Sequence, residues 1–225
     1  MQLEEITPDI FNLIFETHFS MASTFLRFGE HYESPEFRGK VFTFKEYKKW
    51  YVNNSPWKKD RNKFTYYTDW GGFNVPSEFL EPFYDGKFDP LSKKEKRLLG
   101  LFENRRGKKS SIMGTTKEDG PKIMERTLRH EVAHGLFYTS TEYQSRVLEA
   151  LSRVNPEKRS EIRNLVVDKW KYHPSRFEDE MHAYILDPKS FLLRNGVEVD
   201  SIKPVRRELK KIFREHTKGI NFKRD

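Results

Sequence analysis

The sequence predicts an α+β fold that is mainly helical, with a small β-sheet beside one long helix. Apolar residues recur every three or four positions through most of the chain, which is typical of amphipathic helices. A few short runs rich in aromatic residues are bounded by Gly and Pro, as strands often are. The 225 residues include 19 Phe, 10 Tyr and 4 Trp but are only 36% hydrophobic, so bulky rings must supply much of the core.

We expect one domain over residues 1–225. It comprises an N-terminal helical and β portion (1–70), a central portion (71–190) and a C-terminal basic helix (191–225). The first residues lack the basic start and apolar run of a secretory signal, and no stretch approaches the roughly 20 apolar residues of a membrane span. These features predict a cytoplasmic protein without a transmembrane segment.

In the N-terminal portion, the spacing predicts a helix that opens at Thr7 with Pro8 in its first turn. Strands are expected over residues 38–43 and 64–70. Between them, Thr43 and Glu46 form a capping box that starts a short helix through residue 51. Beyond Gly71 and Gly72, which stop the second strand, we expect a helical turn to begin at residue 73.

In the central portion, Ser92 and Glu95 form a second capping box, and residues 110–115 are a weak strand. A long helix then opens at residues 120–121. Three further helices are expected over 141–154, 156–172 and 175–186, the last with Ser175 and Glu178 as its capping box. The final helix, 204–216, is amphipathic with a basic outer face.

The long helix carries a His-Glu-x-x-His motif. His130 and His134 are four residues apart, so both imidazoles project from one helix face and can reach a single tetrahedral ion. Glu131 is rotated by about 100° from His130 and is better placed to hold a water than to join the ligands. The chain has no cysteine, which excludes thiolate sites and thiol nucleophiles, so any metal must use His, Asp or Glu.

This arrangement suits zinc-dependent peptide hydrolysis. Zinc lowers the pKa of a bound water toward about 7, and a nearby carboxylate accepts a proton as the water attacks a peptide carbonyl. Glu131 is the expected general base, and it would return the proton to the leaving amine. Chance alone produces the motif about once per hundred chains of this length, so it is informative but not conclusive.

The third ligand must come from elsewhere, because Phe137 and Ser140 stand where the metzincin pattern requires Gly and His. A separate expected helix contains Glu180-x-x-Ala183. Here the sequence resembles the gluzincin class of zinc metallopeptidases, and more loosely, over residues 70–186, small bacterial proteins with this motif. The resemblance implies a zincin-like fold, Zn²⁺ as cofactor, a peptide or protein substrate and Glu180 as the third ligand. The rival ligands are Glu178, Asp179, His182 and His173.

Around this site the sequence leaves several roles open. Many gluzincins place an Asp four residues after the ligand Glu, where this chain has Tyr184. Asp187 could replace it, although we expect it to be an ordinary polar residue before Pro188. The donor to a transition-state oxyanion is open among residues close in sequence to the motif: Tyr138, Tyr143, Tyr172, His173 and Tyr184. Residues 111–115 are either an exposed edge strand that binds substrate or an internal strand or loop.

A second interpretation is a basic module that binds nucleic acid or an anionic membrane surface. The net charge is +8 and the pI about 9.4, which favours anionic partners or acidic substrates. Basic residues cluster at 105–109 and on the outer face of the C-terminal helix, and Trp57 lies beside Lys58, Lys59 and Arg61. Each such run is more often a solvated surface. A structural zinc site is disfavoured because it normally needs four protein ligands.

Overall fold

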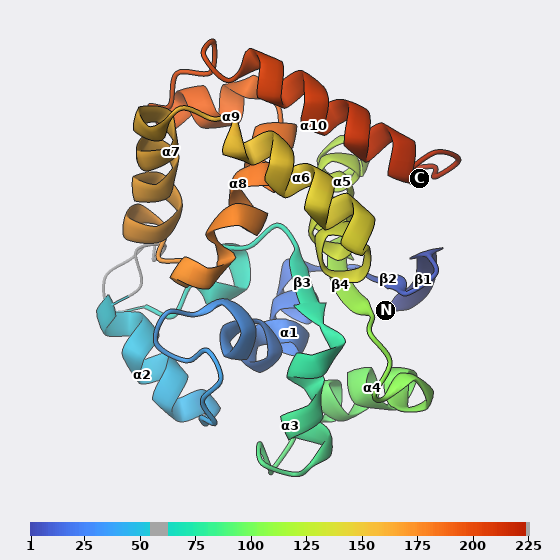
Figure 1. Cartoon of the computed structure of the whole chain (residues 1–225). Helices are drawn as coiled ribbons and strands as arrows, with labels where there is room; N and C mark the ends of the chain where they lie inside the picture. The colour runs from blue at the N-terminus through green and yellow to red at the C-terminus, as the bar shows by residue number, and fades with distance from the viewer. Residues whose placement is uncertain (55–62, 224–225) are drawn as a thin grey trace.

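A computed structural model describes residues 1–54 and 63–223 of the chain (Figure 1). It is mostly helical and has one four-stranded sheet, so the predicted α+β class is confirmed. The elements, in chain order, are β1 (Gln2–Thr7), β2 (Ile10–Phe15), α1 (His18–Glu33), α2 (Phe44–Asn54), β3 (Phe73–Pro76), α3 (Glu81–Tyr84), α4 (Lys93–Phe102), β4 (Ser111–Thr116), α5 (Pro121–Thr139), α6 (Thr141–Ser152), α7 (Pro156–Arg163), α8 (Phe177–Leu186), α9 (Lys189–Arg194) and α10 (Lys203–His216).

The strand order in the sheet is β1-β2-β4-β3. β1 and β2 form an antiparallel hairpin in which Thr7 pairs with Ile10. β2 and β4 are parallel, and Ile10 lies opposite Ser111. β3 pairs with β4 in the antiparallel direction. The two central strands are thus β2 and β4, and every residue of both is buried.

The predicted helix opening at Thr7 is wrong. Residues 2–15 form the β1–β2 hairpin, and the first helix begins only at His18, capped by the side chain of Thr17. Because β2 packs on both of its faces, nearly all of its residues are apolar. Its apolar residues therefore fit the helical spacing of three or four as well as the strand spacing of two. Periodicity alone does not separate such a buried strand from a helix.

Three further local predictions in the first half are wrong. Residues 38–43 form no strand, and residues 64–70 contain only a 3-10 turn, Tyr66–Thr68. Residues 73–76, expected to begin a helical turn, form β3, and the helical turns follow at Ser77–Leu80 and in α3. The capping box of Thr43 and Glu46 is confirmed by its hydrogen bonds, and that of Ser92 and Glu95 likewise.

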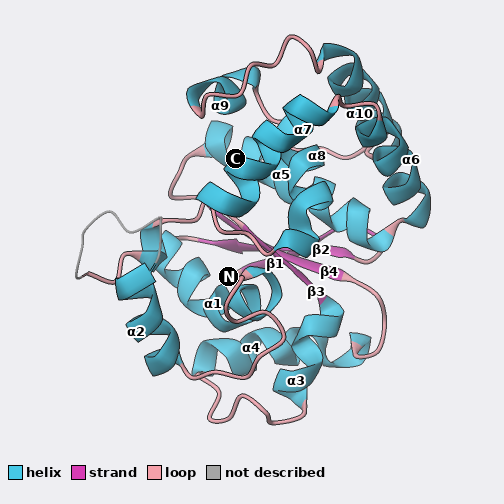
Figure 2. Cartoon of the chain, turned by 60° about the vertical axis from the view of Figure 1, so that its left-hand side comes forward, coloured by secondary structure: helices cyan, strands magenta, loops and turns pink. Residues whose placement is uncertain are grey.

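The sheet lies between two groups of helices (Figure 2). One face carries an aromatic-rich core shared with α1 to α4, to which β2 contributes Phe11, Leu13 and Phe15. The opposite face carries a second core shared with α5 to α10, to which Ile10 and β4 Met113 belong. Side chains therefore alternate between the two cores along each central strand, as a strand buried on both faces requires.

The second half follows the predicted series of helices. α5 begins after Gly120, whose φ of +78° suits glycine, and has Pro121 in its first turn. α5 packs against the sheet so closely that a Cβ at Gly135 would lie 3.1 Å from Ile10 Cδ1. The expected helix 156–172 is shorter, because α7 passes into a π-helical stretch at Asn164–Lys169. Among the described residues, none of the helices combines the length and apolar character needed to span a membrane.

Candidate metal centre

The structure brings together His130 and His134 of α5 and Glu180 of α8. One ligand atom from each residue can be chosen so that all three atoms lie within 4.8 Å of one another. His130 Nε2 lies 3.2 Å from His134 Nε2, and His134 Nε2 lies 3.8 Å from Glu180 Oε2. His134 and Glu180 are buried, whereas His130 is partly exposed. The three donors thus converge at the interface of two packed helices.

These residues fit a divalent cation. Glu180 is 1% exposed, and its Oε2 accepts no hydrogen bond from any described residue. An unpaired buried carboxylate oxygen is costly, and a cation between it and the two imidazoles would remove that cost. Two His nitrogens and one carboxylate oxygen are also the donor set of His₂Glu zinc sites.

Each of the two histidines has a carboxylate beside its other ring nitrogen. His134 Nδ1 lies 2.8 Å from Asp179 Oδ1, and His130 Nδ1 lies 3.3 Å from Asp187 Oδ2. A carboxylate in this position fixes the ring and makes the opposite nitrogen a better metal donor. Asp179 is therefore placed to orient the candidate ligand His134 and lies outside the group of three convergent donors. Asp187, expected to be an ordinary polar residue before Pro188, lies beside the other candidate ligand, His130.

The remaining rival ligands lie in other arrangements. Glu178 forms an ion pair with Arg159 and does not cap α8. The Ser175 hydroxyl is hydrogen-bonded to His173 Nδ1 at 2.8 Å. The predicted capping box at 175–178 is therefore wrong: a 3-10 turn, Pro174–Arg176, leads into the helix. His182 is fully buried and stacks on Phe137 at 4.9 Å between ring centroids.

Glu131 lies against the start of β3. A Cβ built on Gly72 would fall 2.5 Å from Glu131 Oε1, so only glycine leaves room for this carboxylate. The side chain of Asn74 holds the same segment to α5 by donating to the backbone oxygen of Glu131 at 2.9 Å. Burial raises the pKa of Glu131 to about 8 in the metal-free protein. The carboxylate is thus both confined and desolvated.

Two charged residues at the site were missed by sequence reasoning. The Arg176 guanidinium pairs with Asp179, lies 3.6 Å from Glu180 Oε1 and lies 4.0 Å from Glu33 Oε1 at the end of α1. Its spacing of three and four residues from the two carboxylates was a readable signal. Glu33 gave no signal, because only the tertiary fold brings α1 to this place.

The carboxylates set the charge of the centre. Burial lowers the pKa of His130, but Asp187, Glu131 and Glu180 outweigh it and raise the value to about 10 without metal. Burial similarly opposes the ionisation of Asp179, yet Arg176 and His134 hold its pKa well below the usual range. The metal-free site therefore holds positive charge on His130 and Arg176 and negative charge on Asp179.

Of the residues proposed as oxyanion donors, Tyr184 and Tyr172 lie nearest the centre. The Tyr184 ring is 5.0 Å from the His130 ring between centroids, and the two hydroxyls lie 3.1 Å apart. Tyr138 instead lies under Lys109, and Tyr143 packs against His182 and His216. The Tyr184 ring thus lies beside His130 and is joined to Tyr172 through the hydroxyls, whereas His173 Nδ1 is engaged by Ser175.

Residues 111–115 are not an edge strand, because β4 lies between β2 and β3. The edge of the sheet near α5 is β3, whose four residues are all buried. Two of the four cations in the basic turn at 105–109 form ion pairs: Arg105 with Asp9, and Arg106 with Glu81 and Asp85. The Trp57 cluster with Lys58, Lys59 and Arg61 lies outside the described residues.

Comparison with known proteins adds no family to this geometry. No protein-family model, curated protein or solved structure matches the chain. The assignment of a function therefore depends on the residues of the centre themselves.

Proposed function

We propose that this protein is a zincin-like, zinc-dependent hydrolase of peptide bonds. The observation that carries the proposal is the convergence of His130, His134 and Glu180, with Glu131 of the same motif held beside them. The carboxylates Asp179 and Asp187 support it, because each lies at the outer nitrogen of one of the histidines.

In this proposal the chain's own residues bind and orient the metal and move one proton. His130, His134 and Glu180 would hold Zn²⁺, which would supply Lewis-acid activation of a carbonyl and of water. Glu131 would accept a proton at its carboxylate from the water that attacks the carbonyl carbon, and would donate it to the amide nitrogen as the C–N bond breaks. The placement of its carboxylate beside Gly72, where a Cβ would fall 2.5 Å from Oε1, keeps it close to the three candidate ligands.

A purely structural zinc site has less support. Such sites are usually closed by four protein ligands. In the part of the chain that the structure describes, the cluster of His, Asp and Glu ligand atoms has three members. Asp179, a further carboxylate at the centre, is already engaged with His134 and Arg176.

The test is to combine metal analysis with one substitution. We expect purified protein to contain about one zinc per chain and Glu131→Gln to retain that zinc while cleavage of a quenched-fluorescence peptide library falls about 10²–10⁴-fold. Glu149→Gln, at an exposed residue of α6, is the matched control and should leave both zinc and cleavage unchanged. Folded protein that binds no zinc, or undiminished cleavage by Glu131→Gln, would contradict the proposal.

A further inference from the structure

A groove opens beside the centre between the first half of α5 and α10. Its volume is ≈ 980 Å³, which is at the upper end of the range for ligand sites in proteins. Leu186 at the end of α8 and Pro188 just beyond it also line the groove. The groove meets the metal centre directly, because His130 and Asp187 are both among its lining residues.

The walls of the groove are strongly basic. α5 contributes Lys122, Arg126 and Arg129, which recur along one face of the helix. α10 contributes four more cations along its own facing side: Arg206, Arg207, Lys210 and Arg214. The only acidic residues in the described lining are Glu125 and Asp187.

Several of these cations have no carboxylate of their own. Arg129 pairs with Glu125 at 3.1 Å, and Arg206 donates to the backbone oxygens of residues 185 and 187. Within the described residues, no ion pair is found for Arg126 or Lys210. Burial and then the neighbouring charges of Arg206, Arg214 and Lys189 lower the pKa of Lys210.

The floor of the groove is apolar. Phe213, Leu186, Pro188 and Ile123 line it, and Ile123 is 42% exposed. A nucleic-acid site would be expected to offer exposed aromatic rings for base stacking, whereas Phe213, the aromatic side chain of this lining, is 7% exposed. Basic walls over aliphatic side chains better complement a peptide in which acidic and apolar residues alternate.

We propose that this groove binds an acidic segment of a peptide and leads it to the centre at His130. Cleavage of the bound peptide rests on the proposed function, whereas its binding in the groove does not. The cations would attract acidic side chains, and the aliphatic floor would bury the apolar residues between them. The protein would therefore select substrates that are acidic on one side of the scissile bond.

The test measures binding separately from cleavage. Every protein carries Glu131→Gln, and fluorescence anisotropy follows a labelled peptide of alternating Glu and Leu and the same peptide with Gln for each Glu. We expect the acidic peptide to bind more tightly, with an affinity that falls as salt is added. The double variant Arg126→Glu/Lys210→Glu, one residue from each wall, should weaken binding about tenfold.

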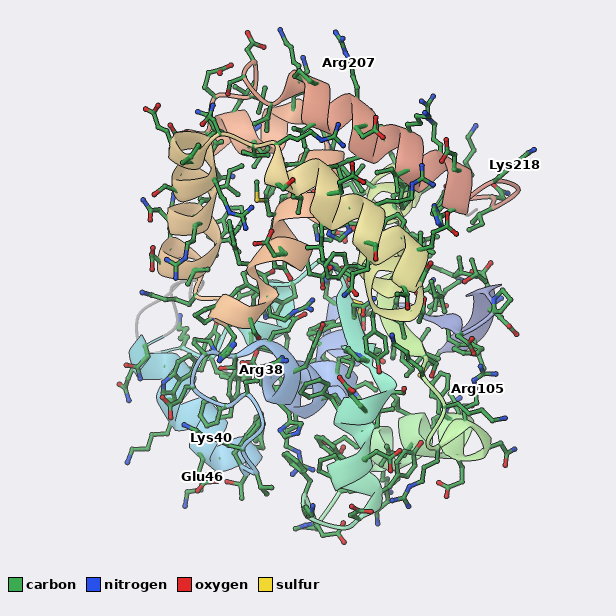
Figure 3. The ribbon with its side chains drawn as sticks, in the orientation of Figure 1. Arg38, Lys40, Glu46, Arg105, Arg207 and Lys218 are labelled. Atoms are coloured by element: carbon green, nitrogen blue, oxygen red, sulfur yellow. The ribbon has the colours of Figure 1, made fainter. Side chains whose placement is uncertain are left out.

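The matched control is Lys211→Glu/Lys218→Glu, which changes the net charge by the same amount at two exposed lysines outside the groove. Figure 3 shows Lys218 projecting from the turn beyond α10. This control should bind the acidic peptide as the parent does. Equal binding of the two peptides, no effect of the groove variant, or tighter binding of a single-stranded oligonucleotide that displaces the peptide would overturn the proposal.

Cleavage by the protein with native Glu131 then separates the two proposals. Binding of the acidic peptide in the groove without cleavage leaves the groove assignment standing and counts against the hydrolase. Cleavage of the Glu and Gln peptides with equal kcat/KM supports the hydrolase and overturns the groove as its specificity site.

Discussion

At the scale of single residues, the candidate metal centre includes two carboxylates that lie behind the histidines and outside the group of three convergent donors. Asp179 is buried with Arg176, so its charge is compensated and it can hold His134 Nδ1 at 2.8 Å. Asp187 is the residue that caps the C-terminal end of α8, with φ −56° and ψ 166°. From this position its side chain lies 3.3 Å from His130 Nδ1. One short segment thus places a carboxylate beside the Nδ1 atom of each histidine.

Replacing Asp187 tests this role. Asp187→Asn should weaken zinc affinity about 10–100-fold, because the amide cannot supply the negative charge at His130 Nδ1. A competition titration against a chelator measures the change, and circular dichroism should show an unchanged fold. Asp168→Asn, at a carboxylate that is 58% exposed, serves as the control. Unchanged zinc affinity in Asp187→Asn would show that the carboxylate does not act on His130.

The confinement of Glu131 can be tested at the glycine pair before β3. Gly72→Ala places a Cβ 2.5 Å from Glu131 Oε1 and 2.6 Å from Thr127 Cγ2, so the carboxylate must move. We expect zinc content to be kept and peptide cleavage to fall about 10²-fold, since a displacement of about 1 Å has that effect on a catalytic group.

Gly71→Ala is the matched control for this substitution. A Cβ there would lie 3.7 Å from Thr127 Oγ1, which is an ordinary contact. Cleavage should stay near the native rate. If the two alanine variants cleave at the same rate, the position of the Glu131 carboxylate is not set by Gly72.

The sequence predicted which three side chains converge better than it predicted their surroundings. The motif requires two imidazoles on one helix face, and that local geometry survives in any tertiary context. The position of Asp187 beside His130 could not be predicted from helical spacing. Such spacing relates Asp187 to Glu180 only while the helix continues, and α8 ends one residue earlier, at Leu186. Glu33 was beyond reach for another reason: it comes to Arg176 through the packing of α1.

At the scale of elements, many helix starts were predicted from local sequence, whereas most strands were missed because they depend on tertiary packing. The capping boxes at Thr43 and Ser92 mark helix starts correctly, because a cap is a local hydrogen-bond pattern. The β1–β2 hairpin was missed, because β2 is buried on both faces and does not alternate with polar residues. Its turn did carry a signal, since Pro8 precedes Asp9, which adopts φ +71°.

α1 also carries a buried carboxylate whose effect on stability can be measured. Burial raises the pKa of Glu30 from 4.5 to about 7, although the hydroxyls of Tyr47 and Tyr66 donate to it. The folded state therefore holds a proton that the unfolded state releases above about pH 4.5. The free energy of unfolding should fall as the pH rises from about 4.5 to about 7, by about 3 kcal/mol at most from this residue.

Glu30→Gln should remove that part of the slope, because the amide stays neutral throughout. Chemical denaturation of both proteins with a chelator present, at several pH values, isolates the difference. Glu149→Gln, an exposed substitution, should retain the native slope. A parallel pH dependence in the Glu30→Gln and native proteins would mean that Glu30 is ionised in the folded state.

At the scale of the whole molecule, the centre joins parts of the chain that are distant in sequence. α5 and α8 belong to the core on one face of the sheet, while β3 lies beside Glu131 and α1 reaches Arg176 through Glu33. Without a metal, burial and the surrounding carboxylates raise the pKa of Glu180 well above its usual value. A bound cation would reduce the repulsion that Glu33 of α1 and Asp179 of α8 exert on the Glu180 carboxylate.

Zinc should therefore stabilise the complete fold and not only its own ligands. A metal that binds the native state alone adds about 2.7 kcal/mol at a free concentration one hundred times its Kd, which raises the Tm of a chain of this size by about 5–10 °C. Differential scanning calorimetry of metal-free and zinc-saturated protein measures the shift. His130→Ala removes one of the three candidate ligands, the one that is partly exposed. We therefore expect zinc not to raise the Tm of this variant. An equal rise in His130→Ala would place the zinc at another site and remove the basis for assigning Glu131 a catalytic role.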